Sequence, residues 1–364
     1  MNMNRLFTCL CLSLLFNLVQ AQLPIPEYQK GKAILSGTIA NYHPNDNLIF
    51  KIGAPNIVMG TAETLYPTVE SDGSFTINIP LYHHTQVRMM IGNADLVILL
   101  SPEKETNVAI NLSNPPGKQF VFSGQYATIN NEWCQPELIT KIPPVYSDGD
   151  LLDSIVGISA NEFKKRCINQ YKRYVTHNSA QLQFSEDTRT LANLSCAFDC
   201  LENLQATHYC LQTAYQKKEN ITREQAFAAF LDVYLPDDFH NYLKDFPVNH
   251  PLALYCYNYR NVVMDLYDTH KDPLAYEKNL LKNAPLTKEE QTLIHQYETA
   301  FKAGISFQQE SELMALSAKY FKENDQFRWE SFSKAKERLS NIIQDSTSLI
   351  VDYIRAIYMR SSFY

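Results

Sequence analysis

The sequence predicts a segregated α+β protein, in which an N-terminal antiparallel β-sandwich or open barrel is followed by an all-α helical bundle. Two observations support this fold class. Eight of the eleven glycines lie within residues 22–125, where short apolar–polar alternations predict strands separated by turns. After residue 150, helix-start motifs and longer segments replace this alternation. A chain of 364 residues is long enough for about two domains.

Residues 1–21 have the pattern of a secretory signal peptide. Arg5 precedes a mostly apolar stretch from Leu6 to Leu18, and Val19-Gln20-Ala21 suits a signal peptidase. We therefore expect an exported protein, soluble in the periplasm. The apolar stretch is shorter than the roughly 20 residues that span a bilayer, and no later segment is long enough, so no membrane span is predicted.

Residues 22–127 are predicted to form the β domain. Phe75, Ile77 and Ile79 alternate with polar residues, so one face of this strand is buried, and Asp72-Gly73 supplies the turn before it. Similar segments predict about seven strands: Ala33–Ala40, Asn47–Ile52, Ser74–Ile79, Gln86–Ile91, Leu96–Leu100, Asn107–Leu112 and Gln119–Phe122.

Residues 128–150 are predicted to be a connector without regular structure, because Pro136, Pro143 and Pro144 interrupt the segment. Residues 151–364 are predicted to form the helical domain. Three Ser/Thr-x-x-Glu/Gln motifs predict helix starts at Ser159 with Glu162, Thr222 with Gln225, and Thr287 with Glu290. Further helices are expected over about Ser185–Tyr215, Pro236–Phe246, Pro251–Tyr267, Glu310–Phe321 and Phe332–Asn341.

The last part of the chain carries an apolar stripe at helical spacing, which predicts one more helix. Its members are Leu349, Ile350, Tyr353, Ile354, Ile357 and Tyr358. We expect this stripe to pack within the same bundle, on another subunit of a homo-oligomer, or on a domain absent from this chain. The net charge of −7 makes sequence-independent binding to nucleic acid unfavourable, so no nucleic-acid partner is predicted.

Several short motifs occur together in the first two thirds of the chain. They are Leu35-Ser36-Gly37-Thr38-Ile39, Asp72-Gly73-Ser74-Phe75, Ser101-Pro102-Glu103 followed by Val108-Ala109-Ile110, Phe122-Ser123-Gly124-Gln125-Tyr126-Ala127 with Asn130, and the segment Pro236–Pro251. Together they resemble the N-terminal β domain and helical insert of the TlpA-like thiol-disulfide oxidoreductases of Bacteroidota. The resemblance covers nearly all of the chain after residue 21. It implies a thioredoxin-like domain or protein as a partner.

In that family the chemistry belongs to a C-terminal thioredoxin domain with a Cys-x-x-Cys motif, in which a lowered thiol pKa makes the nucleophile. This chain contains no such motif, and its closest spacing is Cys196-x-x-x-Cys200. No catalytic residue of the family can therefore be carried over to this chain. No cofactor is predicted either.

Cys196 and Cys200 lie one helical turn apart, with His208 and Cys210 further along the chain. A metal or redox cluster is one interpretation of these three cysteines. A structural zinc site takes four ligands with tight turns between pairs, and one continuous helix does not bring Cys210 to the face of Cys196. We therefore favour buried core thiols, and no metal site is predicted.

Two other groups of residues have side chains that could bind a metal ion. His83 and His84 are adjacent on a strand and point to opposite faces, so they do not chelate one ion together. Asp148, Asp150 and Asp153 lack the glycine and the terminal glutamate of a calcium loop. We expect these acidic residues to form the solvated approach to a helix.

Tyr255, Tyr257 and Tyr259, next to Arg260, are candidates for a binding surface. Tyrosine offers an apolar face and a polar tip, which suits a glycan or a peptide. Half-buried packing between helices is the other interpretation of the same residues.

The leading functional hypothesis is an exported, non-catalytic module that positions a thioredoxin domain, a partner or another subunit. The alternative is a stand-alone binding protein of the cell envelope that uses its helical domain to hold a glycan or peptide. A hydrolase of unrecognised type is the least favoured hypothesis, because the sequence assembles no set of nucleophile, base or metal ligands.

Overall fold

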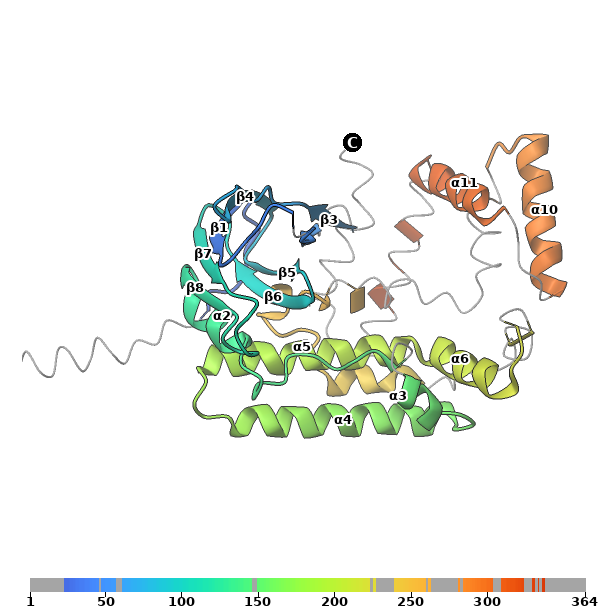
Figure 1. Cartoon of the computed structure of the whole chain (residues 1–364). Coiled ribbons are helices and arrows are strands. Elements are labelled where there is room, and N and C mark those ends of the chain that lie inside the picture. Colours follow the sequence, from blue (N-terminus) through green and yellow to red (C-terminus); the bar gives the residue numbers. More distant parts are fainter. Residues whose placement is uncertain are drawn as a thin grey trace, which may run out of the picture.

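The computed structural model describes residues 23–45, 47–56, 61–145, 149–222, 225–226, 239–259, 261–262, 281, 284–303, 309–323, 329–330, 333 and 336–337. The expected signal peptide, nearly all of the helix predicted over Phe332–Asn341 and the apolar stripe from Leu349 to Tyr358 lie outside these residues. In the described part, eight strands are followed by helices (Figure 1). The predicted α+β class, with strands first and helices after, is confirmed.

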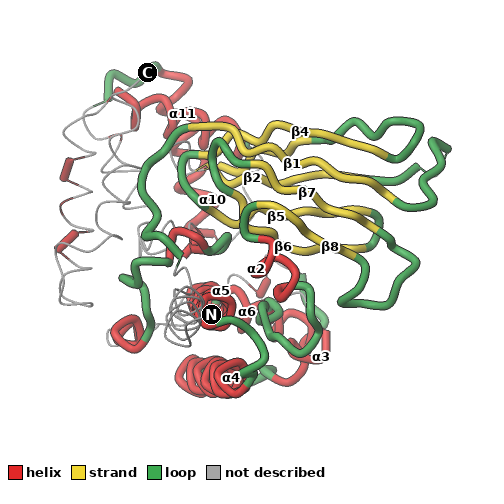
Figure 2. Tube along the Cα trace, turned by 90° about the vertical axis from the view of Figure 1, so that its left-hand side faces the viewer, coloured by secondary structure: helices red, strands yellow, loops and turns green. Residues whose placement is uncertain are grey.

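The strands form two four-stranded sheets, one with the order β4-β1-β7-β8 and the other with the order β3-β2-β5-β6. Figure 2 shows the strands above α4, α5 and α6. The strands are β1 (Gly31–Ile39), β2 (Phe50–Asn56), β3 (Thr61–Leu65), β4 (Ser74–Leu81), β5 (Thr85–Ile91), β6 (Ala94–Leu100), β7 (Glu105–Ile110) and β8 (Phe120–Gly124).

Two features of the sheets differ from the sequence prediction. β3 was not among the predicted strands, because Leu65 is its only large apolar residue. β1 pairs antiparallel with β4 but parallel with β7, where Leu35 lies opposite Thr106, so the domain is not purely antiparallel. A parallel pair needs a long crossover, and here the second sheet is formed by chain that lies between β1 and β7.

The sandwich core lies between the two sheets. Phe50 and Phe75 meet there edge to face, with ring centroids 4.9 Å apart. Phe75 and Ile79 are buried, as the alternation in this strand predicts. A Cβ at Gly37 would lie only 2.1 Å from the carbonyl oxygen of Val108, so glycine permits the close approach of β1 to β7.

The segment predicted as an irregular connector begins with a short helix, α2 (Ala127–Trp133). Asn130 accepts a hydrogen bond from Leu99 N at 2.7 Å and donates one to Leu99 O at 3.1 Å. The next residue, Asn131, makes the same pair of bonds with Phe122, at 2.8 and 2.9 Å. Because Leu99 is on β6 and Phe122 on β8, α2 ties the two sheets together at one end.

After α2 the connector crosses the helices without regular structure, as its prolines predict. Buried polar side chains supply the backbone hydrogen bonds that it would otherwise lack. Asn178 accepts from Ile139 N at 3.0 Å and donates to Ile139 O at 2.8 Å. Asn203 accepts from Val145 N at 3.0 Å.

Four helices follow: α3 (Gly149–Ser154), α4 (Ala160–Ala180), α5 (Glu186–Gln205) and α6 (Thr207–Glu219). The predicted start at Ser159 is confirmed, because its hydroxyl accepts from Glu162 N at 3.2 Å. The single helix predicted over Ser185–Tyr215 is wrong, since Ala206 separates α5 from α6. Figure 1 shows α4 and α5 running antiparallel, with α5 next to the sheets.

The reciprocal capping bonds predicted for the two later motifs are present, with Thr222 paired to Gln225 and Thr287 paired to Glu290. The second motif precedes α10 (Lys288–Ala303), and α11 (Glu310–Glu323) confirms the helix predicted over Glu310–Phe321.

The segments predicted as helices over Pro236–Phe246 and Pro251–Tyr267 are described only in part, over residues 239–246, 251–259 and 261–262. The described parts contain 3-10 helices η2 (Phe239–Asp245) and η3 (Ala253–Tyr255). Pro247 and Pro251 both lie between these two 3-10 helices, where proline disfavours a continuous helix. No helix in the described part of the chain is long and apolar enough to cross a membrane.

One hydrophobic core joins the β domain to the helices. Leu23 and Leu99 pack in the same buried cluster as Trp133 of α2, Phe163 of α4 and Phe198 of α5. A second cluster lies between the sheets, and a third, small one holds α11 against Leu281.

Candidate functional site

A cavity of about 320 Å³ lies where the β domain meets the helices. Its wall is formed by β5 and β6, the turn before β8, α2, the connector, α5 and the segment around Tyr257. The lining is mixed, with Leu96, Phe120 and Trp133 beside charged and amide side chains. Clefts between structural units that combine apolar walls with a few polar groups are the usual place for small ligands. This cavity is therefore the candidate functional site.

Asp199 of α5 is the most deeply buried acid of the cavity, with 4% of its surface exposed. One carboxylate oxygen accepts from Ile142 N at 2.7 Å, and the other accepts from Asn258 Nδ2. Burial raises the pKa of Asp199 to about 7, and the nearby charge of Glu202 acts in the same direction. The two hydrogen bonds and Lys141 oppose this rise. The carboxyl group is thus placed to exchange a proton near neutral pH.

A second pair of charges lines the same cavity on the strands. Arg88 of β5 makes a two-point ion pair with Asp95 of β6, with distances of 2.7 and 2.6 Å. Hydrogen bonding to Arg88 lowers the pKa of Asp95 and also raises that of Arg88. Both side chains are partly exposed, so this pair fixes the orientation of Arg88 more than it adds stability.

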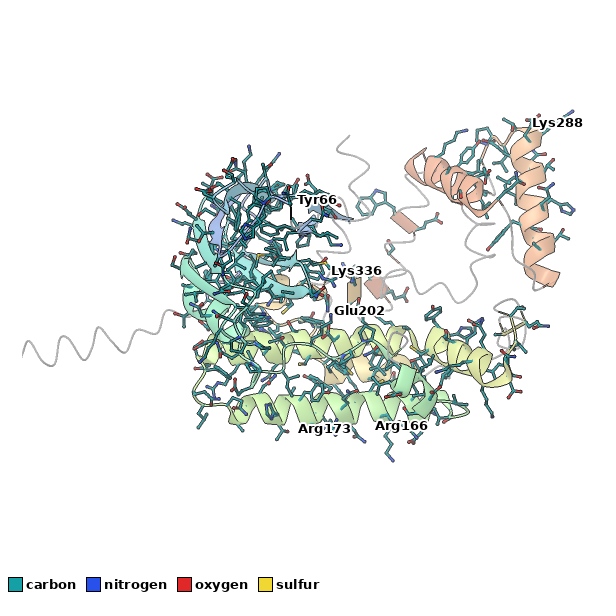
Figure 3. All side chains as sticks on the ribbon, viewed as in Figure 1. Tyr66, Arg166, Arg173, Glu202, Lys288 and Lys336 are labelled. Atoms are coloured by element: carbon teal, nitrogen blue, oxygen red, sulfur yellow. The ribbon has the colours of Figure 1, made fainter. Side chains whose placement is uncertain are left out.

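The cavity is tied together across the two halves of the chain. Gln86 of β5 is buried, and its side-chain oxygen accepts from Tyr257 N at 3.1 Å. Asn258 then reaches Asp199 on α5. Asn261 donates to Glu202 at 2.7 Å, and Figure 3 shows Glu202 on the side of α5 away from Arg166 and Arg173 of α4. The segment from Tyr257 to Asn261 therefore bridges β5 and α5.

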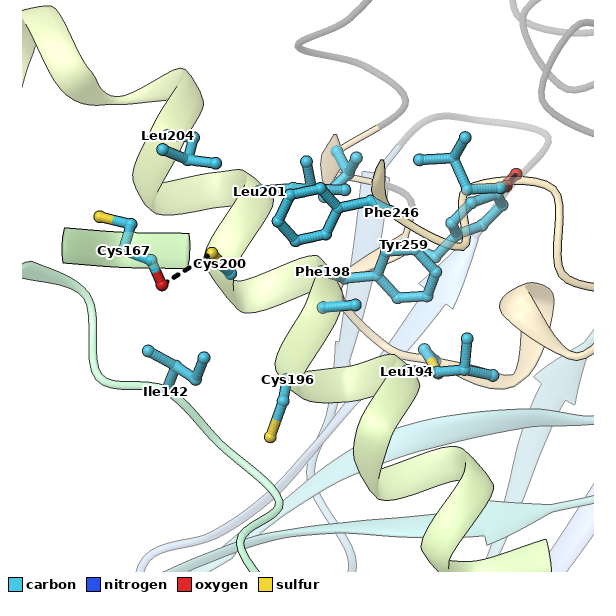
Figure 4. Packing of buried hydrophobic residues seen from close by; sticks show 14 of the residues in the cluster. Ile142, Cys167, Leu194, Cys196, Phe198, Cys200, Leu201, Leu204, Phe246 and Tyr259 are labelled. Atoms are coloured by element: carbon cyan, nitrogen blue, oxygen red, sulfur yellow. Dashed lines mark hydrogen bonds between the residues drawn. The ribbon is translucent and has the colours of Figure 1, made fainter. Parts of the chain in front are cut away.

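The cysteine candidates lie in the core next to the cavity. Cys196, Cys200 and Cys210 are all buried, and none of the three is in a disulfide bond. Cys200 donates to the carbonyl oxygen of Cys167 at 3.4 Å, and Cys196, one turn earlier on the same side of α5 (Figure 4), donates to Ile139 O at 3.3 Å. Burial raises the pKa of Cys196 to about 12 and raises that of Cys200 as well. No cluster of metal ligands occurs among the described residues.

The tyrosine candidates are divided by the fold. Tyr255 and Tyr259 are buried, and Tyr259 packs on Phe198 with ring centroids 5.0 Å apart. Tyr257 lines the cavity. Arg260 lies outside the described residues. The structure thus brings one of these four candidates to the cavity.

A pair of histidines lies in the turn between β4 and β5, beside the first described residues of the chain. His84 Nδ1 lies 2.5 Å from the hydroxyl of Tyr126, and Tyr255 donates to Pro24 O at 2.9 Å. His83 is buried, and neither of its ring nitrogens has a hydrogen-bond partner. Burial lowers the pKa of His83 to about 4, and the charge of His84 adds to this effect. Neither histidine lines the cavity.

Asp199, Asn258 and the Arg88–Asp95 pair were not among the candidates predicted from the sequence. One signal for Asp199 was available, because it is the only ionisable acid between Leu191 and Leu201, a run of mostly apolar residues. A charged residue in such a run is buried with partners or forms part of a site. The cavity itself joins residues from Gln86 to Asn258, and no local pattern brings them together.

Comparison of the chain with protein-family models, with curated proteins and with solved structures finds no match.

Proposed function

We propose that this chain is an exported, non-catalytic module that holds a thioredoxin-like domain or another protein in a fixed position. The observation that carries the proposal is the hydrophobic core shared by the β domain and helices α2, α4 and α5. A shared core resists relative motion of the two halves, which is what a positioning module requires. The proposal also rests on the sequence resemblance to the front part of TlpA-like oxidoreductases.

The state of the cysteines supports a structural role for them. Thiol-disulfide exchange requires a thiolate that is accessible to the substrate. Cys196 and Cys200 are buried, and burial raises the pKa of both thiols. A thiol in this environment stays protonated at neutral pH and packs as a small apolar group.

A reductase assay tests this proposal. The purified full chain is incubated with insulin and dithiothreitol, and the rate of insulin precipitation is compared with that of dithiothreitol alone. We expect equal rates, and we expect Cys196→Ser and Cys200→Ser to leave the rate unchanged. A faster rate that either substitution abolishes would overturn the proposal.

The mass of the native protein in its source cells tests the positioning role separately. A mass that corresponds to Gln22–Tyr364 would support export and a separate module that acts on a partner. A mass larger by on the order of 100 residues would mean that the chain positions a domain of its own. A native protein that retains residues 1–21 would contradict export.

The alternative function, a cell-envelope binding protein for a glycan or peptide, is favoured by the cavity rather than by an aromatic surface. Tyr255 and Tyr259 are buried, which counts against a glycan platform built from the three tyrosines. Tyr257 and the charged groups around it line a hollow of suitable size.

A further inference from the structure

The cavity places a buried carboxyl group beside neutral hydrogen-bond donors only. Asp199 receives one hydrogen bond from a backbone N–H and one from the amide of Asn258. Among the described residues, no Lys or Arg forms an ion pair with it. A carboxylate can accept about four hydrogen bonds, so the carboxylate of Asp199 can accept about two more from a ligand. Buried charges in proteins are normally paired, and a cationic ligand would supply the missing partner.

The lining of the cavity also contains an exposed positive charge. Lys141 of the connector lines the cavity and is exposed. Its charge acts on Asp95 and Asp199, yet it makes no ion pair with either. Arg88 is already held by both oxygens of Asp95. Lys141 is therefore the cation that is available to a ligand, and it would attract an anionic group.

The remaining wall sets the size and the polarity of the ligand. Trp133, Leu96 and Phe120 provide an apolar side, and the face of an aromatic ring also attracts an ammonium group. A volume of about 320 Å³ is at the lower end of the range of small-molecule sites. The ligand is therefore small, with one cationic end, one anionic end and a modest apolar part.

We propose that this cavity binds a free amino acid or a dipeptide, with its ammonium group on Asp199 and its carboxylate on Lys141. Tyr257 and Asn258 close the site from the side of the helical half, because their segment is anchored to Gln86 and Asp199. This inference is independent of the positioning role, since a module can bind a small ligand with or without a thioredoxin-like partner.

Isothermal titration of the full chain with four matched probes tests the proposal. The probes are L-leucine, N-acetyl-L-leucine, which lacks the ammonium group, L-leucinamide, which lacks the carboxylate, and the dipeptide alanyl-leucine. Maltose serves as the neutral polyol. We expect leucine or alanyl-leucine to bind, N-acetyl-leucine to bind at least tenfold more weakly than leucine, and maltose not to bind.

Two substitutions assign the two ends of the ligand. Asp199→Asn is expected to weaken binding of leucine at least tenfold, whereas the matched exposed substitution Asp245→Asn leaves it unchanged. Lys141→Ala is expected to weaken binding of leucine but not of leucinamide. Because Asp199→Asn disturbs a buried hydrogen-bond pair and its folding can suffer, the exposed Lys141→Ala variant decides the proposal by itself.

The pH dependence of the wild-type chain gives a further readout. Glu202 on the same helix and Lys141 on the connector are the charged groups that act on Asp199, while Arg88, Asp95 and Tyr257 line the cavity with it. Leucine affinity is expected to rise between pH 6 and 8 as Asp199 ionises. The proposal is overturned if neither leucine nor alanyl-leucine binds at millimolar concentration, if N-acetyl-leucine binds as tightly as leucine, or if maltose alone binds.

Discussion

Asparagine side chains take the place of backbone partners at several points of this fold. Asn130, Asn131 and Asn178 each bind both the N–H and the C=O of one other residue. The amide group offers a donor and an acceptor at the spacing of a peptide unit, so it can satisfy one residue of an edge strand or of an extended segment. These three asparagines hydrogen-bond backbone groups of β6, β8 and the connector in the way that a neighbouring strand would.

Asn130 gives the sharpest test of this role. It is buried, and Asn130→Ala would leave the N–H and C=O of Leu99 without their partner. We expect the free energy of unfolding to fall by about 2–4 kcal/mol, because each unsatisfied buried group costs about 1–3 kcal/mol. Urea denaturation measures the change. Asn169→Ala, at an exposed position of α4, should change it by less than about 0.5 kcal/mol.

At the scale of elements, α2 also organises the start of α5. Glu132 of α2 accepts from the hydroxyls of Ser185 and Thr188 at 2.6 and 2.5 Å, and from Ser185 N at 3.1 Å. The hydroxyl of Ser185 in turn accepts from Thr188 N at 3.4 Å. A carboxylate at a helix N-terminus satisfies free N–H groups and interacts favourably with the helix dipole. The N-cap residue of α5, Ser185, is thus held in place by a carboxylate from another helix.

Glu132→Ala is therefore expected to loosen the first turn of α5. The free energy of unfolding should fall by about 1–3 kcal/mol, since the lost hydrogen bonds are to a charged group. Hydrogen exchange of the amides of Glu186–Thr188 should become faster than in the wild-type chain. Glu137→Ala is the control. It also removes an acid that follows α2 closely in the chain, but Glu137 is exposed and its carboxylate is not bonded to the start of α5. Equal effects of the two substitutions would contradict the capping role.

The elements also show where sequence reasoning succeeds and where it stops. The alternation around Phe75 and the capping pairs at Ser159 and Thr287 depend on neighbours within a few residues, so the pattern alone reveals them. The parallel pairing of β1 with β7 and the break at Ala206 depend on distant packing. No short pattern in the sequence records that packing.

The candidate site was harder to predict for the same reason. The sequence suggested Tyr257 through its place in a tyrosine-rich segment, whereas Asp199, Asn258 and Arg88 become a group only in the folded chain. Asp199 is an acid in an apolar run, which the sequence analysis passed over, and its partners lie about 60 residues away on either side. Burial, which sets its pKa, cannot be read from one position of the sequence.

For the whole molecule, two buried groups have opposite effects on the pH dependence of stability. Burial lowers the pKa of His83 to about 4, so its contribution is complete above pH 6.5 and is lost as the pH falls towards 4. Burial raises the pKa of Asp199 to about 7, so its contribution is complete below about pH 3.8 and is lost as the pH rises towards 7. Between pH 4 and 6.5 the two contributions largely cancel.

When one of the two residues is replaced, the pH dependence of stability that the other contributes should become visible. His83→Leu is expected to make stability fall more steeply than in the wild type as the pH rises from 4 to 6.5. Asp199→Asn should have the reverse effect, a steeper fall as the pH decreases over the same range. Relative to the wild type, each variant's free energy of unfolding should change by about 3 kcal/mol between pH 4 and 6.5, because one proton contributes about 1.4 kcal/mol for each pH unit. Urea denaturation at a series of pH values measures both, and parallel curves for all three proteins would contradict the assignment.

The position of α2 also bears on how the chain avoids polymerisation. β6 and β8 are end strands of their sheets, and an end strand with unpaired backbone groups is a template on which a strand of another molecule can grow. Asn130 and Asn131 occupy backbone groups of both strands at Leu99 and Phe122. Addition of a further strand is thus hindered at Leu99 of β6 and at Phe122 of β8, while the other end of the first sheet, β4, is bridged at Phe75 by Val69.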